Sequence, residues 1–199
     1  MTMKSIKLLI VISISIFLFS CGESLPIDDD LSDKSYSLLN QDSVAVDYPS
    51  NVKSKIAVVG YVFTNCPDIC PLTTNNMRLV QEKINEEGIT GVEFVTITFD
   101  PEYDTPSVLK EYAEVRRLDT SNWMFLTGDK AITDEVMKDA GVVAVPSDST
   151  LMESGNMMYF FVHTDRIHLL DQQNRIRGTY LGSQADINKL VNDIKILAN

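Results

Sequence analysis

The chain has 199 residues and a formal net charge of −11 at pH 7, with 44% hydrophobic and 23% charged residues. This composition is ordinary for a globular protein, and the acidic balance argues against a nucleic-acid partner, which requires a basic face. Three cysteines and two histidines are too few for a disulfide-rich scaffold or a large metal cluster. We therefore expect one folded domain whose chemistry uses few soft ligands.

Residues 1–20 have the pattern of an export signal. Lys4 and Lys7 form a basic region before an apolar stretch over residues 8–19, which is shorter than the roughly 20 residues of a membrane-spanning helix. The sequence Leu-Phe-Ser-Cys-Gly around Cys21 resembles a bacterial lipobox, which implies cleavage before Cys21 and its lipidation. We expect a protein of the bacterial cell envelope, outside the cytoplasm and held on a membrane by lipid. An uncleaved anchor is the alternative.

Residues 21–50 are polar and acidic, with consecutive aspartates at 28–30 and no sustained periodicity. This composition predicts an acidic flexible tether that contains at most one short strand, near residues 43–47. The folded domain is then expected over residues 51–199.

The domain alternates between strand and helix patterns. Continuous apolar runs predict buried strands at residues 55–63, 92–99 and 123–126. Proline at the start of a pattern and glycine at its end predict helices at residues 71–87, 105–118 and 131–140. A β-hairpin over residues 166–180 and an amphipathic helix over 187–197 follow.

This order of elements predicts an α/β, thioredoxin-like fold. A central mixed sheet is flanked by helices, and the hairpin and the last helix close the chain. On the helix that begins near Pro71, we expect Leu72, Val80 and Ile84 to face the core.

Cys66 and Cys70 are separated by three residues in the loop between the first buried strand and its helix. Ligands of α/β folds bind at this end of the sheet, and a helix N-terminus favours thiolate. The pair itself leaves three roles open: a structural disulfide, a redox dithiol or a soft-metal site. A disulfide across so short a loop stabilises little, and thioredoxin-like reductases use a shorter Cys-x-x-Cys motif with a nearby cis-proline. We favour a metal site.

Two thiolates suit Cu(I), which accepts two or three ligands, whereas structural zinc usually takes four. His163 comes just before the predicted hairpin and is expected as the third ligand. His168 lies within the strand and points to the opposite face, so we expect it to be a packing residue.

Three segments of the chain closely resemble the Sco (SenC-like) family: YVFTNCPDICP at residues 61–71, TFDPEYDTP at 98–106, and His163-Thr164 before Asp171. The resemblance covers about residues 50–197. It implies a thioredoxin-like, membrane-anchored, extracytoplasmic domain that binds copper, as Cu(I) or Cu(II), through Cys66, Cys70 and His163.

The resemblance also implies a role. The expected function is that of a metallochaperone, rather than an enzyme, that delivers copper to the CuA centre in the copper-binding subunit of cytochrome c oxidase. Other copper chaperones and thioredoxin-like reductants are expected as further partners. The alternatives are a thiol–disulfide reductase of the CuA cysteines, with Cys66 and Cys70 as its redox disulfide, and a redox or copper sensor.

Other residues near the motifs receive structural roles. Family members usually carry an acidic residue directly before the histidine, where this chain has Val162. Asp68 is expected as an exposed loop carboxylate, with tuning of the thiols or contact with a partner as the alternatives. The stretches Asp100-Pro101 and Asp104-Thr105-Pro106 are expected to supply turn and capping residues and no ligands, with Thr105 as the N-cap of the helix. Three methionines lie on a predicted loop before the histidine, with packing as their expected role and copper handling as the alternative; they are Met152, Met157 and Met158.

Overall fold

The computed structural model describes residues 24–151 and 157–198. At its centre lies β4 (Ile56–Val62), in which every residue is buried. Burial on both faces explains why this strand is a continuous apolar run and not an alternating one. β5 (Val92–Thr98) pairs with β4 in parallel, and β6 (Trp123–Thr127) pairs with β5 in parallel. These three strands correspond to the strands predicted at residues 55–63, 92–99 and 123–126.

Antiparallel strands extend this parallel centre on both sides into an eight-stranded sheet of order β1-β10-β9-β4-β5-β6-β2-β3. The predicted hairpin is present as β9 (Ile167–Leu170) and β10 (Arg175–Tyr180), and β9 lies directly beside β4. The outer strands are β1 (Asp29–Asp30), β2 (Tyr36–Asn40) and β3 (Ala45–Tyr48).

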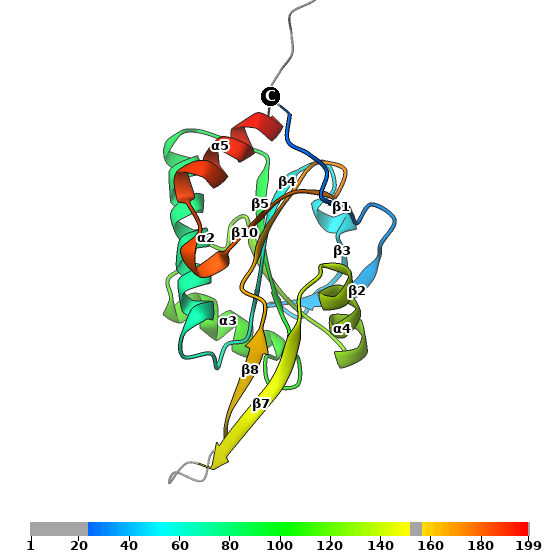
Figure 1. Cartoon of the computed structure of the whole chain (residues 1–199), viewed down its shortest axis with the longest axis vertical. Coiled ribbons are helices and arrows are strands. Elements are labelled where there is room, and N and C mark those ends of the chain that lie inside the picture. Colours follow the sequence, from blue (N-terminus) through cyan, green and yellow to red (C-terminus); the bar gives the residue numbers. More distant parts are fainter. Residues whose placement is uncertain (1–23, 152–156, 199) are drawn as a thin grey trace, which may run out of the picture.

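Helices cover both faces of the sheet (Figure 1). One face packs against α2 (Ile69–Glu86), α3 (Pro106–Val115) and α5 (Ile187–Ala198). The other face packs against α4 (Lys130–Asp139). Two short 3-10 helices complete the elements, η1 (Ser50–Val52) and η2 (Gly182–Gln184).

The buried face of α2 differs in one position from the prediction. Val80 and Ile84 are fully buried as expected, but Leu72 is 50% exposed. Thr73 and Met77 occupy the inner face instead. Thr73 lies seven residues before Val80 and Met77 seven residues before Ile84, a spacing that places them on the same side of the helix. Leu72 is one residue, about 100°, away from that face.

The prediction of a flexible tether over residues 21–50 is wrong for the residues that form β1 and β2, whereas the short strand expected near residues 43–47 is present as β3. This segment is polar overall, but it contains a few apolar side chains that are buried in the core. They are Leu31, Tyr36, Leu38 and Tyr48, each at most 4% exposed. β2 pairs with β6 and β3, and β1 pairs with β10. Residues 1–20 and Cys21 lie outside the described residues.

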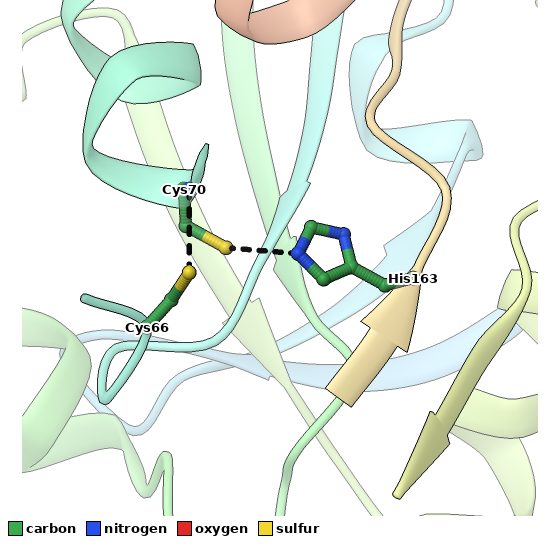
Figure 2. Close-up of side chains that lie close together, drawn as sticks. All are labelled: Cys66, Cys70 and His163. Atoms are coloured by element: carbon green, nitrogen blue, oxygen red, sulfur yellow. Dashed lines mark hydrogen bonds between the residues drawn. The ribbon is translucent and has the colours of Figure 1, made fainter. Parts of the chain in front are cut away.

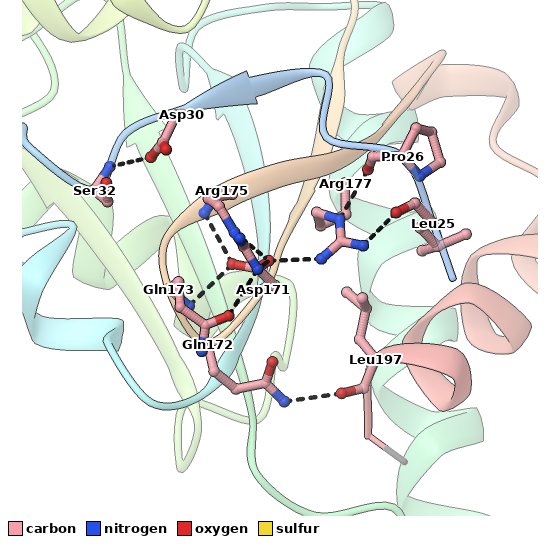
Figure 3. A network of polar contacts seen from close by, with 10 residues as sticks. All are labelled: Leu25, Pro26, Asp30, Ser32, Asp171, Gln172, Gln173, Arg175, Arg177 and Leu197. Carbon is pink, nitrogen blue, oxygen red and sulfur yellow. Dashed lines mark hydrogen bonds and ion pairs between the residues drawn. The ribbon is translucent and has the colours of Figure 1, made fainter. Parts of the chain in front are cut away.

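The first described residues are fastened to β10 by Arg177 (Figure 3). Its guanidinium donates to the carbonyl oxygens of Leu25 and Pro26, the latter at 2.8 Å, and to Asp171 at 2.8 Å. The backbone of this segment continues the attachment, because Asp28 N donates to Ile176 O at 2.8 Å. We call this attachment of residues 25–30 to β10 the N-terminal strap.

A second, two-stranded sheet consists of β7 (Ala144–Leu151) and β8 (Met157–His163). The sequence analysis missed it and assigned a loop to the methionines; Met157 and Met158 in fact begin β8, and Met152 lies outside the described residues. This hairpin projects at the end of the molecule opposite the strap and α5 (Figure 1). Among the described helices, none is both long and apolar enough to cross a membrane.

Candidate metal centre

Cys66 and Cys70 sit where the central strand turns into a helix. β4 ends at Val62, Cys66 lies in the loop that follows, and Cys70 is in the first turn of α2. The backbone N–H of Cys70 points at Cys66 Sγ at 3.5 Å. Both thiols are free and buried, with Cys66 9% and Cys70 1% exposed. The N-terminus of α2 therefore directs its positive dipole end at the two sulfurs.

His163 reaches this loop from the end of β8 (Figure 2). Its Nε2 lies 3.8 Å from Cys70 Sγ, and the ligand atoms of Cys66, Cys70 and His163 all lie within 4.8 Å of one another. The other ring nitrogen, Nδ1, lies 3.2 Å from the carbonyl oxygen of Thr164. Because a carbonyl only accepts hydrogen bonds, Nδ1 donates to it, and Nε2 is the ring nitrogen that faces the sulfurs.

The two thiols differ in acidity. A hydrogen bond from Cys70, together with one from His163 and backbone amides, lowers the pKa of Cys66 to about 4 despite its partial burial. The Cys66 sulfur and burial raise the pKa of Cys70. Burial alone would lower the pKa of His163, but the Cys66 sulfur and the Thr164 carbonyl raise it overall. One thiolate is thus present in the resting site, and it is the form that binds metals or attacks disulfides.

The spacing of the three donors fits one metal ion. Sulfur and nitrogen ligands bind borderline metals such as zinc at about 2.0–2.3 Å, so three ligands in a plane around one ion lie about 4 Å apart. The observed limit of 4.8 Å is within a small side-chain adjustment of that value. Two sulfurs and one imidazole suit a soft ion of low coordination number.

Aromatic side chains wall the site, a feature that sequence analysis missed. The His163 ring lies 5.0 Å from that of Phe99 and 6.4 Å from that of Phe63, and Phe161 packs against both phenylalanines. A pocket of about 240 Å³ opens over Cys66, Asp68 and His163. Phe63 and Phe99 directly follow β4 and β5. Their shared position at the carboxyl ends of neighbouring parallel strands is the sequence feature that could have placed them at the site.

Asp104 braces the cysteine loop. Its buried carboxylate accepts hydrogen bonds from the backbone N–H and hydroxyl of Thr64 and from the hydroxyl of Thr98. Burial raises the pKa of Asp104 to about 6. As predicted for this stretch, Asp104 lies in the turn before α3 and Thr105 occupies the N-cap of that helix. Asp100 lies in the same turn and accepts a hydrogen bond from Tyr159 of β8.

The remaining singled-out residues lie outside the cluster of three donors. His168 is buried and its Nδ1 lies 2.9 Å from Tyr61 Oη; burial and Arg166 lower its pKa to about 3, as suits a packing residue. Asp68 is exposed at the rim of the pocket. Val162 is 67% exposed, so the side chain at this position points away from the imidazole.

Fold and site together define a thioredoxin-like α/β domain with a Cys-Cys-His cluster at the carboxyl end of its central strand. The SCO1/SenC family model matches residues 26–199, and the chain belongs to this family.

Individual relatives and solved structures support membership of this family. A SCO1 protein homolog of Bacillus subtilis is 38% identical over 128 residues, which are 63% of this chain and 65% of that protein. The crystal structure of a SCO1/SenC family lipoprotein from Bacillus anthracis is 30% identical with a TM-score of 0.73, over 87% of this chain and 98% of that one. The copper-bound structure of ScoI from Bradyrhizobium japonicum is 25% identical with a TM-score of 0.68, over 82% and 98%. The chain thus spans just under two thirds of the B. subtilis relative's length.

Proposed function

We propose that this protein is a copper metallochaperone that holds one copper ion with Cys66, Cys70 and His163. The observation that carries the proposal is the cluster of two sulfurs and one imidazole nitrogen within 4.8 Å. Two thiolates and a neutral imidazole suit Cu(I), and the imidazole also supports Cu(II). The copper in the B. japonicum relative's structure supports this choice of metal.

Delivery then proceeds by exchange of ligands. The pocket above Cys66 and His163 gives an incoming cysteine access to the metal, and His163, a neutral ligand from a separate element, can leave before the two cysteines. We propose the CuA centre of cytochrome c oxidase as the acceptor, which the family resemblance supports, and other copper chaperones as donors.

An anaerobic Cu(I) titration against a competing chelator tests metal binding. The protein should begin at residue 22, so that Cys21 is absent and the N-terminal strap is kept. We expect one tight equivalent, lost in Cys66→Ser and Cys70→Ser and weakened in His163→Ala. His168→Gln is the matched control, because it removes the imidazole outside the cluster. Failure of the fully reduced protein to compete for Cu(I) would overturn the chaperone proposal.

A second candidate is a thiol–disulfide reductase of the CuA cysteines, favoured by the low pKa of Cys66. The Cys66 thiolate would attack the target's disulfide and release one target thiolate, leaving a mixed disulfide. Cys70, after loss of its proton, would attack Cys66 Sγ and release the second target thiolate. The target gains two electrons, and Cys66 and Cys70 become a disulfide.

A redox-sensor role would use the same conversion of the two thiols to a disulfide.

Mutants separate the two candidates in a cell that assembles the oxidase. Copper delivery requires all three ligands, so His163→Ala should impair CuA formation as Cys66→Ser does. Normal assembly in His163→Ala together with loss in Cys66→Ser would favour the reductase.

We also propose that Cys21 carries the lipid anchor on the extracytoplasmic side of a membrane. The lipoprotein from B. anthracis supports this localisation. Since the N-terminal strap begins at Leu25, only residues 22–24 would separate it from the lipidated cysteine, a span of at most about 14 Å. The strap end of the domain would then face the bilayer, and the hairpin β7–β8 would face away from it (Figure 1). The Cys21→Ala variant should either be released from the membrane or keep its uncleaved signal peptide. Normal cleavage together with retention on the membrane would refute the lipid anchor.

A further inference from the structure

Asp165 joins the two halves of the metal centre. It follows His163 by two residues, and its carboxylate accepts hydrogen bonds from Thr73 Oγ1 at 3.0 Å and from the N–H and hydroxyl of Ser183 at 3.0 and 2.6 Å. Thr73 lies on α2, one turn after Cys70. The carboxylate therefore connects the chain that carries His163 directly to the helix that carries Cys70.

We propose that Asp165 is a positioning residue for His163, which sets the distance between the imidazole and the two sulfurs. The proposal deepens the metal-binding function proposed above and rests on it. Asp165 touches none of the three predicted ligands through a hydrogen bond in the described structure; it acts through the backbone of residues 163–165 and through Thr73.

Close packing makes this connection sensitive to small changes. η2 begins at Gly182, and a Cβ atom there would lie 2.5 Å from Asp165 Oδ1 and 2.7 Å from Thr73 Oγ1. No side chain larger than hydrogen fits without moving the carboxylate or the helix. Asn76 of α2 also donates to the Gly182 carbonyl at 2.8 Å, so η2 is fixed to the same helix. Asp165, Thr73 and residues 182–183 thus form one packed unit, which we call the Asp165 clamp.

The other side of the histidine segment is fixed separately. Thr164 N donates to Val143 O at 2.8 Å, and the Arg166 guanidinium donates to Gly141 O at 2.7 Å. These bonds tie the segment to the turn between α4 and β7, and not to the helix of Cys70. Loss of the clamp should therefore leave the segment folded against that turn and let it move relative to α2.

Four variants of the full chain, purified in detergent, test the role. Asp165→Ala removes the acceptor, Thr73→Val removes the donor on α2 with little change of shape, and Gly182→Ala pushes the carboxylate and helix apart. Asp165→Asn keeps an acceptor oxygen without charge. Asp193→Asn is the matched control, because Asp193 is a buried carboxylate that accepts hydrogen bonds from Tyr180 and Lys189 and, among the described contacts, none from the residues of the Asp165 clamp.

We expect Asp165→Ala, Thr73→Val and Gly182→Ala to bind Cu(II) about 10-fold or more weakly, as is usual when a group that orients a ligand is lost. The nitrogen hyperfine pattern and sulfur-to-copper absorption of the Cu(II) complex should change with them. Asp165→Asn should stay close to wild type in both measurements, which separates positioning from a purely electrostatic effect. Asp193→Asn should leave the copper spectra unchanged even where it lowers the melting temperature.

A metal-free measurement separates failure of this proposal from failure of the copper proposal. In the apo protein, a nuclear Overhauser effect between the His163 ring and the Cys70 side chain should be present in wild type and Asp165→Asn and lost in Asp165→Ala. Absence of copper binding in wild type would overturn the proposed function alone. An unchanged ring contact and unchanged copper spectra in Asp165→Ala would overturn the positioning role.

Discussion

Cys70 Sγ and His163 Nε2 lie 3.8 Å apart although 93 residues separate them in the chain. The topology of the sheet explains this proximity. α2 begins directly after β4, and β8 leads into β9, which pairs with β4 from Ala57 to Gly60. The histidine therefore enters the sheet beside the strand whose loop holds the cysteines.

The two thiols should react at different pH values. The pKa of Cys66 is about 4 and that of Cys70 is raised, so at pH 5 Cys66 is a thiolate and Cys70 a thiol. Iodoacetamide at pH 5 should label Cys66 selectively, as read by peptide mass spectrometry. Cys70→Ala removes the hydrogen-bond donor beside Cys66 and should raise the Cys66 pKa, measurable by thiolate absorbance at 240 nm. Equal labelling of the two cysteines in the folded protein at pH 5 would contradict this assignment.

Asp104 should make the protein less stable as the pH rises from about 4 to 6. The carboxyl has its ordinary pKa of 3.8 when unfolded and about 6 when folded, so over this range the folded state binds more protons and stability falls with pH. A difference of about two pKa units corresponds to about 3 kcal/mol at most. Asp104→Asn cannot titrate and should lack this decline.

Urea unfolding of both proteins at several pH values measures the effect. The free energy of unfolding of wild type minus that of Asp104→Asn should decrease across pH 4–6 and be constant above pH 7, because the other carboxylates contribute equally to both. Two parallel curves would show that Asp104 keeps its ordinary pKa.

The elements with strong local patterns could be predicted from the sequence. β4 and β5 are continuous apolar runs, and α3 begins with Thr105 at its N-cap and Pro106 after it. β2 could not be recognised, because Leu38 is buried only through contacts with distant parts of the chain. β7 contains Pro146 and a register shift beside it, and both disrupt the alternating pattern by which strands are recognised.

In the metal centre, too, the local features could be predicted from the sequence and the contacts between distant segments could not. The cysteine spacing and its place before a helix were local features, and they identified Cys66 and Cys70 as a pair. The parts that support the site come from separate elements: Asp104 reaches Thr64 from the β5–α3 loop, and Asp165 reaches Thr73 across to α2. Such contacts depend on how the elements pack, and a single sequence does not display them.

Gly60 should be required where α2 crosses the sheet. A Cβ atom at this position in β4 would overlap the sulfur of Met77, and Met77 is fully buried, so its side chain would have to shift within the packed core. Gly60→Ala should therefore lower the free energy of unfolding by about 1–3 kcal/mol. In a Met77→Ala background the same change should cost less, because the added methyl group fills part of the cavity. An equal cost of Gly60→Ala in both backgrounds, measured by urea unfolding, would rule out this contact as the cause.

Arg177 should hold the N-terminal strap, whereas its neighbour Arg175 should not. Both arginines pair with the buried Asp171, but Arg177 alone of the two donates to the carbonyls of Leu25 and Pro26 among the described contacts (Figure 3). Arg177→Met should therefore free the strap, and Arg175→Met is the matched control for loss of one ion pair.

Amide hydrogen exchange reports the difference directly. The N–H of Asp28 is bonded to Ile176 O and the N–H of Leu31 to Asn174 O, and exchange at both should be at least about tenfold faster in Arg177→Met, since a hydrogen bond from a charged group contributes about 1.5–3 kcal/mol. In Arg175→Met these two amides should exchange nearly as in wild type. Equal acceleration in the two variants would mean that the Asp171 ion pairs, and not the carbonyl contacts of Arg177, hold the strap, because the strap would then respond to the loss of either arginine.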